Sequence, residues 1–234
     1  MIWLHVIAGL VALAAGAIAL SAAKGRSLHR ASGMTFAVAM AVMTTSAIVM
    51  ALLLRPNTGN LVAGSMTLYL VLTGVLAVKV SAAQARGVLT GLMLAAFGIG
   101  IAAIALARAI ATLPGGRLDG FTPEPLYFFA FVALVAGSLD LRLLLAPELR
   151  GHHRLLRHLW RMGFAMWIAT SSFFIGQARQ FPDYIRATGV LFVPVLLVTI
   201  ALIYWIVRVQ RRRGLAHRPA AAALPDARLA GSRS

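Results

Sequence analysis

Long apolar runs are the feature that most constrains this chain. Seven of them follow one another, over residues 2–23, 31–54, 61–83, 88–107, 126–145, 156–177 and 188–207. A helix rises about 1.5 Å per residue, so a run of about 20 residues crosses the roughly 30 Å hydrocarbon core of a bilayer. In lipid, a helix satisfies its own backbone hydrogen bonds. The sequence therefore predicts an all-α polytopic membrane protein, a bundle of seven transmembrane helices.

Composition agrees with a membrane protein and excludes several kinds of site. The chain is 60% hydrophobic and 12% charged, against about 25% charged in a soluble domain. It has no cysteine, which excludes disulfides, iron–sulfur clusters and thiolate metal sites. The net charge of +16 would suggest nucleic acid for a soluble protein. Here the Arg residues lie beside apolar runs, so we expect the lipid bilayer and its anionic headgroups, and no nucleic acid, as partners.

The basic residues at the ends of the runs predict the orientation. The odd-numbered connections and the tail carry most of them: Lys24, Arg26, Arg30, Lys79, Arg86, Arg150, Arg154, Arg157, Arg161, Arg208 and Arg211–Arg213. The even-numbered connections carry fewer and add Asp119, Glu124 and Asp183. Because cytoplasmic loops are richer in Lys and Arg, we expect an N-terminus outside and a C-terminus inside a bacterial cytoplasmic membrane.

The apolar pattern ends near residue 208. Residues 1–208 are therefore expected to form the transmembrane domain, and residues 209–234 a basic, disordered cytoplasmic tail. Pro194, inside the last run, predicts a kink in that helix.

Asp140 is the acidic residue most deeply placed within an apolar run. Counted along the helix, it lies about 9 Å from the inner edge of the membrane. Arg142, two residues on, does not share its helix face. Asp140 therefore needs a partner from another helix, which we expect to be an Arg or His of the sixth run. The alternative is a role as a ligand orienter or proton acceptor.

Histidines define a second candidate site. His29 begins the second run and His158 the sixth, and both runs start at the inner side, with His153 nearby. Neutral imidazole binds transition metals and haem iron, so haem b is one candidate for this inner cluster. Zinc and copper have weaker support: the H-E-x-x-H and C-x-x-C patterns are absent, although the thioethers of Met162 and Met166 suit Cu(I). The alternative is that these histidines contact headgroups or cap helices.

Polar side chains, most of them hydroxyls, form a third cluster at the outer half of the membrane. It comprises His5, Thr44, Ser46, Thr170, Ser171 and Gln177. His5 is separated from His29 by about 36 Å of helix, so the two cannot share a site. The cluster predicts either an outer pocket for a polar substrate or a quinone headgroup, or hydrogen bonding between helices.

Three patches resemble a family of bacterial predicted membrane proteins catalogued only as a domain of unknown function. They are LHVIAGLVAL with KGRSLHRASG (residues 4–33), SLDLR (138–142) and RHLWRMGFAMWIATSSFFIGQ (157–177). The resemblance implies a multi-helix membrane fold and no established activity, and it draws attention to His5, His29, Asp140, Arg142, His158 and Arg161. The His29–Gly33 spacing is also similar to haem-binding helices of b-type membrane cytochromes, although their paired-His pattern is absent.

Three functions fit these patterns. The first is a small intramembrane redox or haem- or metal-binding protein that uses His29, His153 and His158, with Asp140, Arg142 and Arg161 nearby. The second is a transporter or channel for a small polar solute. The third is an accessory or assembly subunit without chemistry of its own. The chain has no G-x-S-x-G, P-loop or paired carboxylates, so no hydrolase site is indicated and enzymatic activity stays open.

Overall fold

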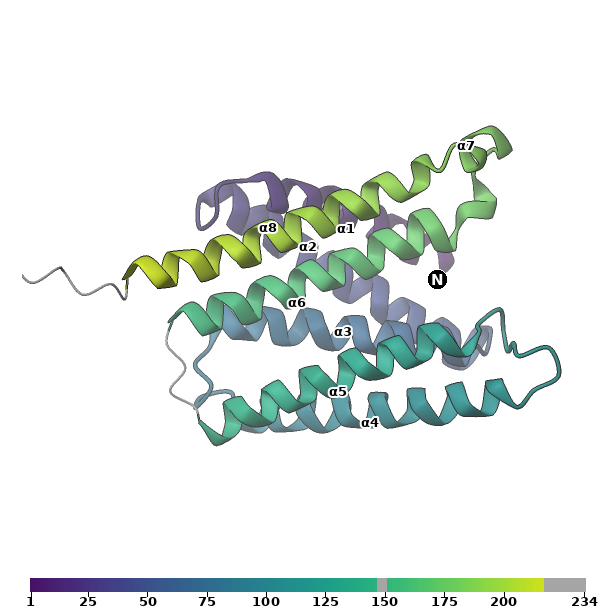
Figure 1. The fold of residues 1–234 in the computed structure, drawn as a ribbon, viewed down its shortest axis with the longest axis horizontal. Helices are drawn as coiled ribbons and strands as arrows, with labels where there is room; N and C mark the ends of the chain where they lie inside the picture. The colour runs from purple at the N-terminus through teal and green to yellow at the C-terminus, as the bar shows by residue number, and fades with distance from the viewer. Residues whose placement is uncertain (147–150, 217–234) are drawn as a thin grey trace, which may run out of the picture.

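The computed structural model describes the backbone of residues 1–146 and 151–216, and the side chains of all of these except 151, 152 and 212–216. Its α-helices are α1 (Ile2–Ser21), α2 (Ser27–Val49), α3 (Thr58–Lys79), α4 (Arg86–Ala111), α5 (Pro123–Leu145), α6 (Gly151–Ser171), α7 (Asp183–Ala187) and α8 (Val193–Ala216) (Figure 1). Short π-helical segments, Met50–Leu54 and Ser172–Gly176, extend α2 and α6. The prediction of an all-α protein is confirmed.

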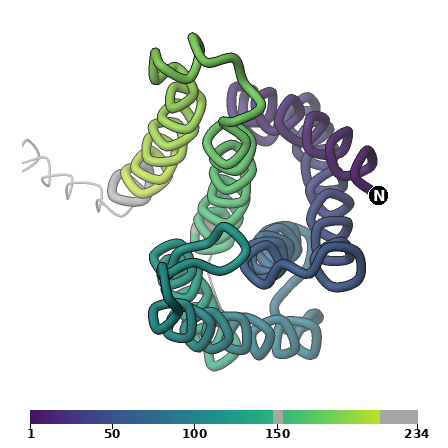
Figure 2. The backbone as a smooth tube through the Cα atoms, turned by 90° about the vertical axis from the view of Figure 1, so that its right-hand side faces the viewer, coloured from purple at the N-terminus to yellow at the C-terminus, as the bar shows by residue number. Residues whose placement is uncertain are grey.

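The long helices form two close pairs joined by a central pair. α1 packs along α2, and α4 packs along α5. Between these pairs, α3 contacts α2, α4, α5 and α6, and α6 lies between α3 and the peripheral α8 (Figure 2). The centre of the bundle is therefore built by α3 and α6, which are far apart in sequence.

The expected count of seven spanning helices needs a correction at α6. Within the described residues, six helices are long and apolar enough to cross a membrane, and α6 is not among them. Its first half carries Arg154, Arg157, His158 and Arg161, which lower its hydropathy. A helix enclosed by its neighbours need not be apolar, and the side chain of Arg161 is fully buried. Polytopic membrane character is confirmed, while α6 differs from a lipid-facing span.

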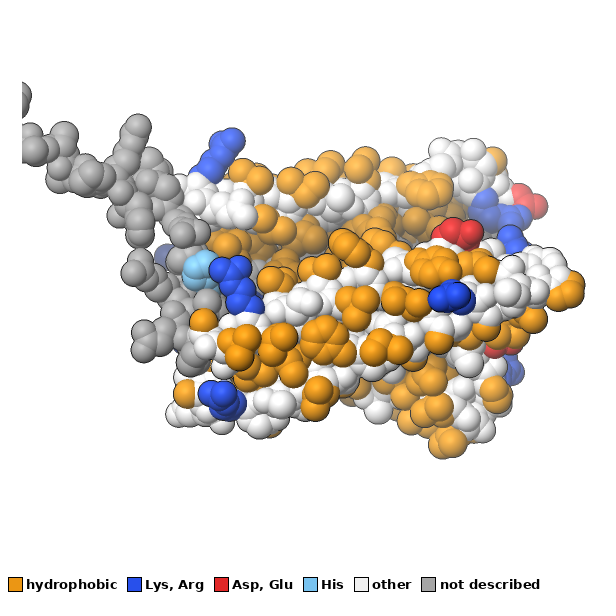
Figure 3. Space-filling view, turned by 60° about the horizontal axis from the view of Figure 1, so that its bottom comes forward, with side chains coloured by type: hydrophobic (Ala, Val, Ile, Leu, Met, Phe, Trp, Pro, Cys, Tyr) orange, Lys and Arg blue, Asp and Glu red, His pale blue; other side chains and the backbone are white. Residues whose placement is uncertain are grey.

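The surface is apolar in the middle and charged toward the ends. On the face drawn in Figure 3, hydrophobic side chains cover the central part, and Lys and Arg side chains lie toward the two ends. This distribution matches a lipid-facing girdle between two polar boundaries. Exposed Leu, Ile and Val side chains, which would be a liability in water, are the expected contacts of lipid tails.

The two ends of the bundle differ in charge. The α1–α2 and α3–α4 connections, the end of α5, the start of α6 and the C-terminal end of α8 share one end, and the N-terminus lies at the other (Figure 1). We call the first the basic end; its described basic residues include Lys24, Arg26, Arg30, Lys79, Arg86, Arg142, Arg154, Arg208 and Arg211. Of the described acidic residues, Asp119, Glu124 and Asp183 belong to connections or helix starts at the opposite end.

The last helix differs from expectation at both of its ends. α8 begins at Val193, so Pro194 lies in its first turn, where a missing N–H is tolerated. The predicted kink within this helix is therefore wrong. α8 also continues to Ala216, so residues 209–216, which were assigned to the tail, are helical. Residues 217–234 lie outside the described part of the chain.

Small residues let the central helices approach closely. Ala12, Ala96, Ala133 and Ala165 are fully buried, as expected where membrane helices pack through small side chains. Gly74 of α3 is the tightest point beside the buried charges. A Cβ placed there would lie 2.8 Å from Met162 Sδ and 3.3 Å from Arg161 Cβ. The absence of a side chain at Gly74 therefore allows α6 to lie directly against α3.

Candidate functional site

Asp140 of α5 is the centre of a buried ionic cluster. Its side chain is fully buried. Oδ1 accepts from Nη2 of Arg157 at 2.7 Å and from Nη2 of Arg161 at 2.6 Å, and Oδ2 accepts from the Tyr69 hydroxyl at 2.5 Å. The expected ion pair with an Arg of the sixth run is present, and it is made with two of them. We call Asp140, Arg157, Arg161, Tyr69 and Thr73 the ionic centre.

Arg161 is held by groups from three helices. Besides Asp140, its guanidinium donates from Nη1 to Thr73 Oγ1 and from Nη2 to the Ala136 carbonyl at 3.3 Å. Its Cζ lies 5.1 Å from the ring centroid of Tyr69 and 5.0 Å from that of Trp160, within the range of cation–π attraction. The guanidinium therefore ties α6 to both α3 and α5.

The charges of the ionic centre do not balance. Two guanidinium groups face one carboxylate, and the Arg157 and Arg161 side chains are 11% and 0% exposed. The Nε atoms of both arginines are buried and have no hydrogen-bond partner among the described residues. Removing an ion from water costs several kcal/mol unless it is paired and hydrogen-bonded. The centre therefore has a surplus positive charge and unused donors in an environment where both are unfavourable.

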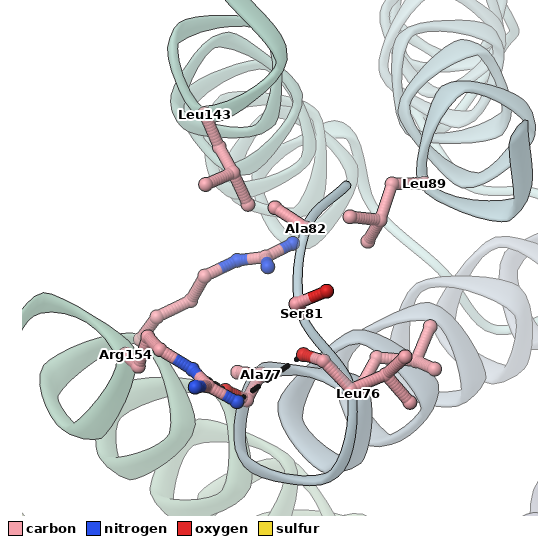
Figure 4. A pocket seen from close by; sticks show the side chains of 9 residues that line it. Leu76, Ala77, Ser81, Ala82, Leu89, Leu143 and Arg154 are labelled. Carbon is pink, nitrogen blue, oxygen red and sulfur yellow. Dashed lines mark hydrogen bonds between the residues drawn. The ribbon is translucent and has the colours of Figure 1, made fainter. Parts of the chain in front are cut away.

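A cavity at the basic end leads toward this centre. It has a volume of about 110 Å³ and lies between α3, the α3–α4 connection, α4, α5 and α6 (Figure 4). Arg154 and Arg157 line it. Arg154 donates from Nε to the Ala77 carbonyl at 3.0 Å and from Nη2 to the Val80 carbonyl at 3.2 Å. The cavity thus touches the same arginine that contacts Asp140.

Three arginines of α6 share one helix face along this route. Arg154, Arg157 and Arg161 are spaced by three and four residues, which places them one above another. Arg154 is half-buried, Arg157 is 11% exposed, and Arg161 is fully buried. We call these three residues the arginine ladder, and it leads from the basic end into the interior of the bundle.

Two of the inner histidines are bonded to backbone carbonyls of neighbouring helices. His158 Nδ1 donates to the Gly74 carbonyl at 2.8 Å, and His29 Nδ1 donates to the Ala19 carbonyl at 3.0 Å. His153 is half-buried earlier on α6. No group of three or more His, Asp or Glu side chains arranged to hold a metal occurs within the described residues.

The residues of the predicted outer polar cluster contact one another only in part. His5 Nδ1 donates to the Met43 carbonyl at 2.9 Å and lies 3.3 Å from Ser46 Oγ, so α1 and α2 meet there. Thr44 and Thr170 are buried and donate to carbonyls four residues earlier in their own helices. Ser171 Oγ is buried without a partner among the described residues, and Gln177 is exposed. These hydroxyls therefore serve mainly their own helices.

Sequence reasoning missed three of the five residues of the ionic centre. Tyr69 and Thr73 were not singled out, although polar groups one turn apart in an apolar run are a signal for a shared polar face. Arg157 was counted only as a charge that sets orientation. Arg142, which was included, is exposed. The signal for Arg157 was its spacing of four residues from Arg161, which places both on the face that meets Asp140.

Comparison with known proteins identifies a family for the chain but no activity. The model of the family described as "Predicted membrane protein (DUF2306)" matches residues 2–124. The match covers the first of the three resembling patches and ends before the ionic pair of α5 and α6. No curated protein and no solved structure matches significantly. Because the match spans more than half of the chain, the protein belongs to this family of predicted membrane proteins of unknown function.

Proposed function

We propose that this protein binds a small anion at the ionic centre and moves it across the membrane. The observation that carries this proposal is the surplus positive charge of Arg157 and Arg161 against the single carboxylate of Asp140. Ionisable side chains within membrane bundles commonly mark substrate or ion pathways. A centre with one uncompensated positive charge and unused N–H donors attracts an anion rather than a cation.

Access to the centre supports the same function. The cavity lined by Arg154 and Arg157 lies at the basic end, and the arginine ladder continues from it to Arg161. An anion that enters the cavity meets Arg157 before the more deeply buried Arg161. Toward the opposite end, Thr44, Ser46, Thr67 and Thr170 are buried polar side chains that line parts of the helix interfaces. Each hydroxyl donates to a carbonyl of its own helix, so passage of an anion requires these hydroxyls to rotate away from the backbone.

The direction of this pathway follows from the charge asymmetry. Most described basic residues lie at the basic end, and the exposed acidic ones lie at the other. By the positive-inside rule the basic end faces the cytoplasm of a bacterial cell, with the N-terminus outside and the C-terminus inside. The basic residues there also attract anionic headgroups. The cavity beside Arg154 is then the cytoplasmic entrance.

Uptake into liposomes tests the proposal. Purified protein is reconstituted in vesicles, and entry of radiolabelled propionate and of phosphate is followed at pH 8, where the uncharged acid is scarce. We expect faster entry than into empty vesicles, and at least a tenfold loss in Arg157→Gln. The matched control is Arg142→Gln, which removes an exposed charge at the same end and retains uptake. Entry of neither anion above the empty vesicles, or full uptake by Arg157→Gln, overturns the proposal.

A second candidate function is suggested by the inner histidines. In His29 and His158, the Nδ1–H is bonded to a backbone carbonyl, an arrangement that fixes the ring and leaves Nε2 free to bind a metal. Two such imidazoles suit haem b, and a redox protein would result. An absorbance spectrum and elemental analysis of the purified protein test this candidate. A Soret band lost in His158→Ala supports it, and a colourless, metal-free, folded preparation from haem- and metal-supplemented cells rules it out.

A further inference from the structure

The cavity at the basic end has two chemically different walls. Its charged wall consists of Arg154 and Arg157, the latter in contact with Asp140. Its apolar wall is made by side chains of α3, α4, α5 and the α3–α4 connection (Figure 4): Leu76, Val80, Ala82, Leu89 and Leu143. A fully hydrated inorganic ion gains nothing from the apolar wall. The arrangement fits a molecule with an anionic head and a short apolar tail.

The charge of the surrounding groups favours a single negative charge on the occupant. Arg157, Arg161 and Asp140 sum to one surplus positive charge. Arg154 adds a further guanidinium, but it donates to the Ala77 and Val80 carbonyls at the C-terminal end of α3. The negative end of that helix dipole offsets part of the Arg154 charge. The four side chains sum to two positive charges, which the α3 dipole, equivalent to about half a negative charge, lowers only in part. A monoanion therefore offsets most of the surplus, and a dianion reverses its sign in a poorly solvated site.

The donors match a carboxylate head. Arg157 and Arg154 both line the cavity, and Arg157 uses Nη2 for Asp140. Guanidinium groups bind carboxylates through two parallel N–H···O bonds. Asp140 already shows that a carboxylate is accepted at this position, since it receives bonds from two arginines. A second carboxylate in the cavity would use the donors that Asp140 leaves free.

The volume limits the tail. The cavity of about 110 Å³ is several times the roughly 10–15 Å³ that one ordered water requires. It admits a carboxylate with a few carbon atoms, and the whole tail of a long fatty acid does not fit within it. We propose that the cavity binds a short-chain monocarboxylate, of which propionate is the probe. This assignment rests on the proposed function, because both use Arg157.

Binding is measured separately from transport. Isothermal titration of the detergent-solubilised protein compares propionate, its neutral analogue propionamide, and inorganic phosphate. We expect binding of propionate, none of propionamide, and an affinity for propionate at least tenfold lower in Arg157→Gln. Thermal melting of each variant verifies that it is folded. Propionamide binding as tightly as propionate would show that the charged wall is not used, and would overturn the assignment.

Chain-length preference tests whether the apolar wall contacts the tail. Leu143→Ala enlarges the cavity, so affinity is expected to move toward butyrate and valerate by about fourfold per added methylene. The control is Leu126→Ala, which removes an equally buried Leu of α5 that does not line the cavity. It should retain the wild-type preference. A folded Leu143→Ala protein with unchanged preference overturns the assignment of the tail to this wall.

The outcomes separate this inference from the proposed function. If phosphate binds and is transported while propionate does neither, the substrate class is wrong and anion transport stands. If propionate binds without being taken up into vesicles, the site stands and transport is wrong. If no anion binds or is taken up, both are wrong.

Discussion

Asp140 of α5 and Arg161 of α6 form a fully buried ion pair, with 2.6 Å between Oδ1 and Nη2. The pair joins two helices that follow one another in sequence but pack mainly on other neighbours, α5 on α4 and α6 on α3 and α8. Tyr69 and Thr73 of α3 complete the connection. The charged side chains of α6 are therefore paired inside the bundle with groups of α3 and α5.

Removing the carboxylate of Asp140 should be strongly destabilising. Asp140→Asn leaves Arg157 and Arg161 without a counter-charge in the interior, and breaking a buried pair in this way costs about 3–5 kcal/mol. Thermal unfolding in detergent or nanodiscs measures the loss. The matched control is Asp183→Asn, since Asp183 is 90% exposed and pairs with Arg186 at the surface. That change should cost no more than about 1 kcal/mol, and equal losses in the two variants would contradict a buried unbalanced centre.

The Tyr69 hydroxyl should contribute measurably to the centre. Tyr69→Phe retains the ring beside Arg161 and removes the 2.5 Å hydrogen bond to Asp140 Oδ2. A hydrogen bond to a charged group contributes about 1.5–3 kcal/mol, so the unfolding free energy should fall by that amount. Tyr127→Phe, at a residue that is 43% exposed, is the control and should have little effect. Indistinguishable melting curves for the two variants would mean that Tyr69 does not stabilise the carboxylate.

Gly74 should tolerate no larger side chain. Gly74→Leu places atoms where Met162 Sδ and Arg161 Cβ lie, so α6 must move away from α3. The His158 hydrogen bond to the Gly74 carbonyl should then be lost, with a cost of at least about 1–3 kcal/mol. Hydrogen exchange along α6 reports the separation. Gly91→Leu is the control, because nothing lies within 4 Å of a Cβ at that position, and faster exchange in both variants alike would argue against close packing at Gly74.

The orientation can be read from cysteine labelling, because the natural chain has no cysteine. Ala83→Cys places one thiol in the α3–α4 connection at the basic end, and Ala187→Cys places one at the end of α7 at the opposite side. Both alanines are exposed. In intact cells, a membrane-impermeant maleimide should label only the Ala187→Cys protein, and lysis should expose the other thiol. Labelling of Ala83→Cys in intact cells would reverse the predicted topology.

The amino-acid sequence by itself determined the class of the protein and the course of its helices. Apolar length is a local property, so the runs predicted at residues 2–23 and 126–145 correspond closely to α1 and α5. The resemblance of the N-terminal patch also identified the family correctly. The need of Asp140 for a partner followed from solvation alone, since an unpaired carboxylate is costly at its depth.

Only the tertiary structure decided which groups meet that need. Tyr69 is separated from Asp140 by 71 residues, and its contact depends on α3 packing against both α5 and α6. The same packing shields Arg161, which is why α6 can carry charges that a lipid-facing helix could not. Hydropathy describes each helix as if lipid surrounded it. Which face of a helix is covered, and by which neighbour, follows from contacts across the bundle, and those contacts place two arginines, a tyrosine and a threonine around one buried carboxylate.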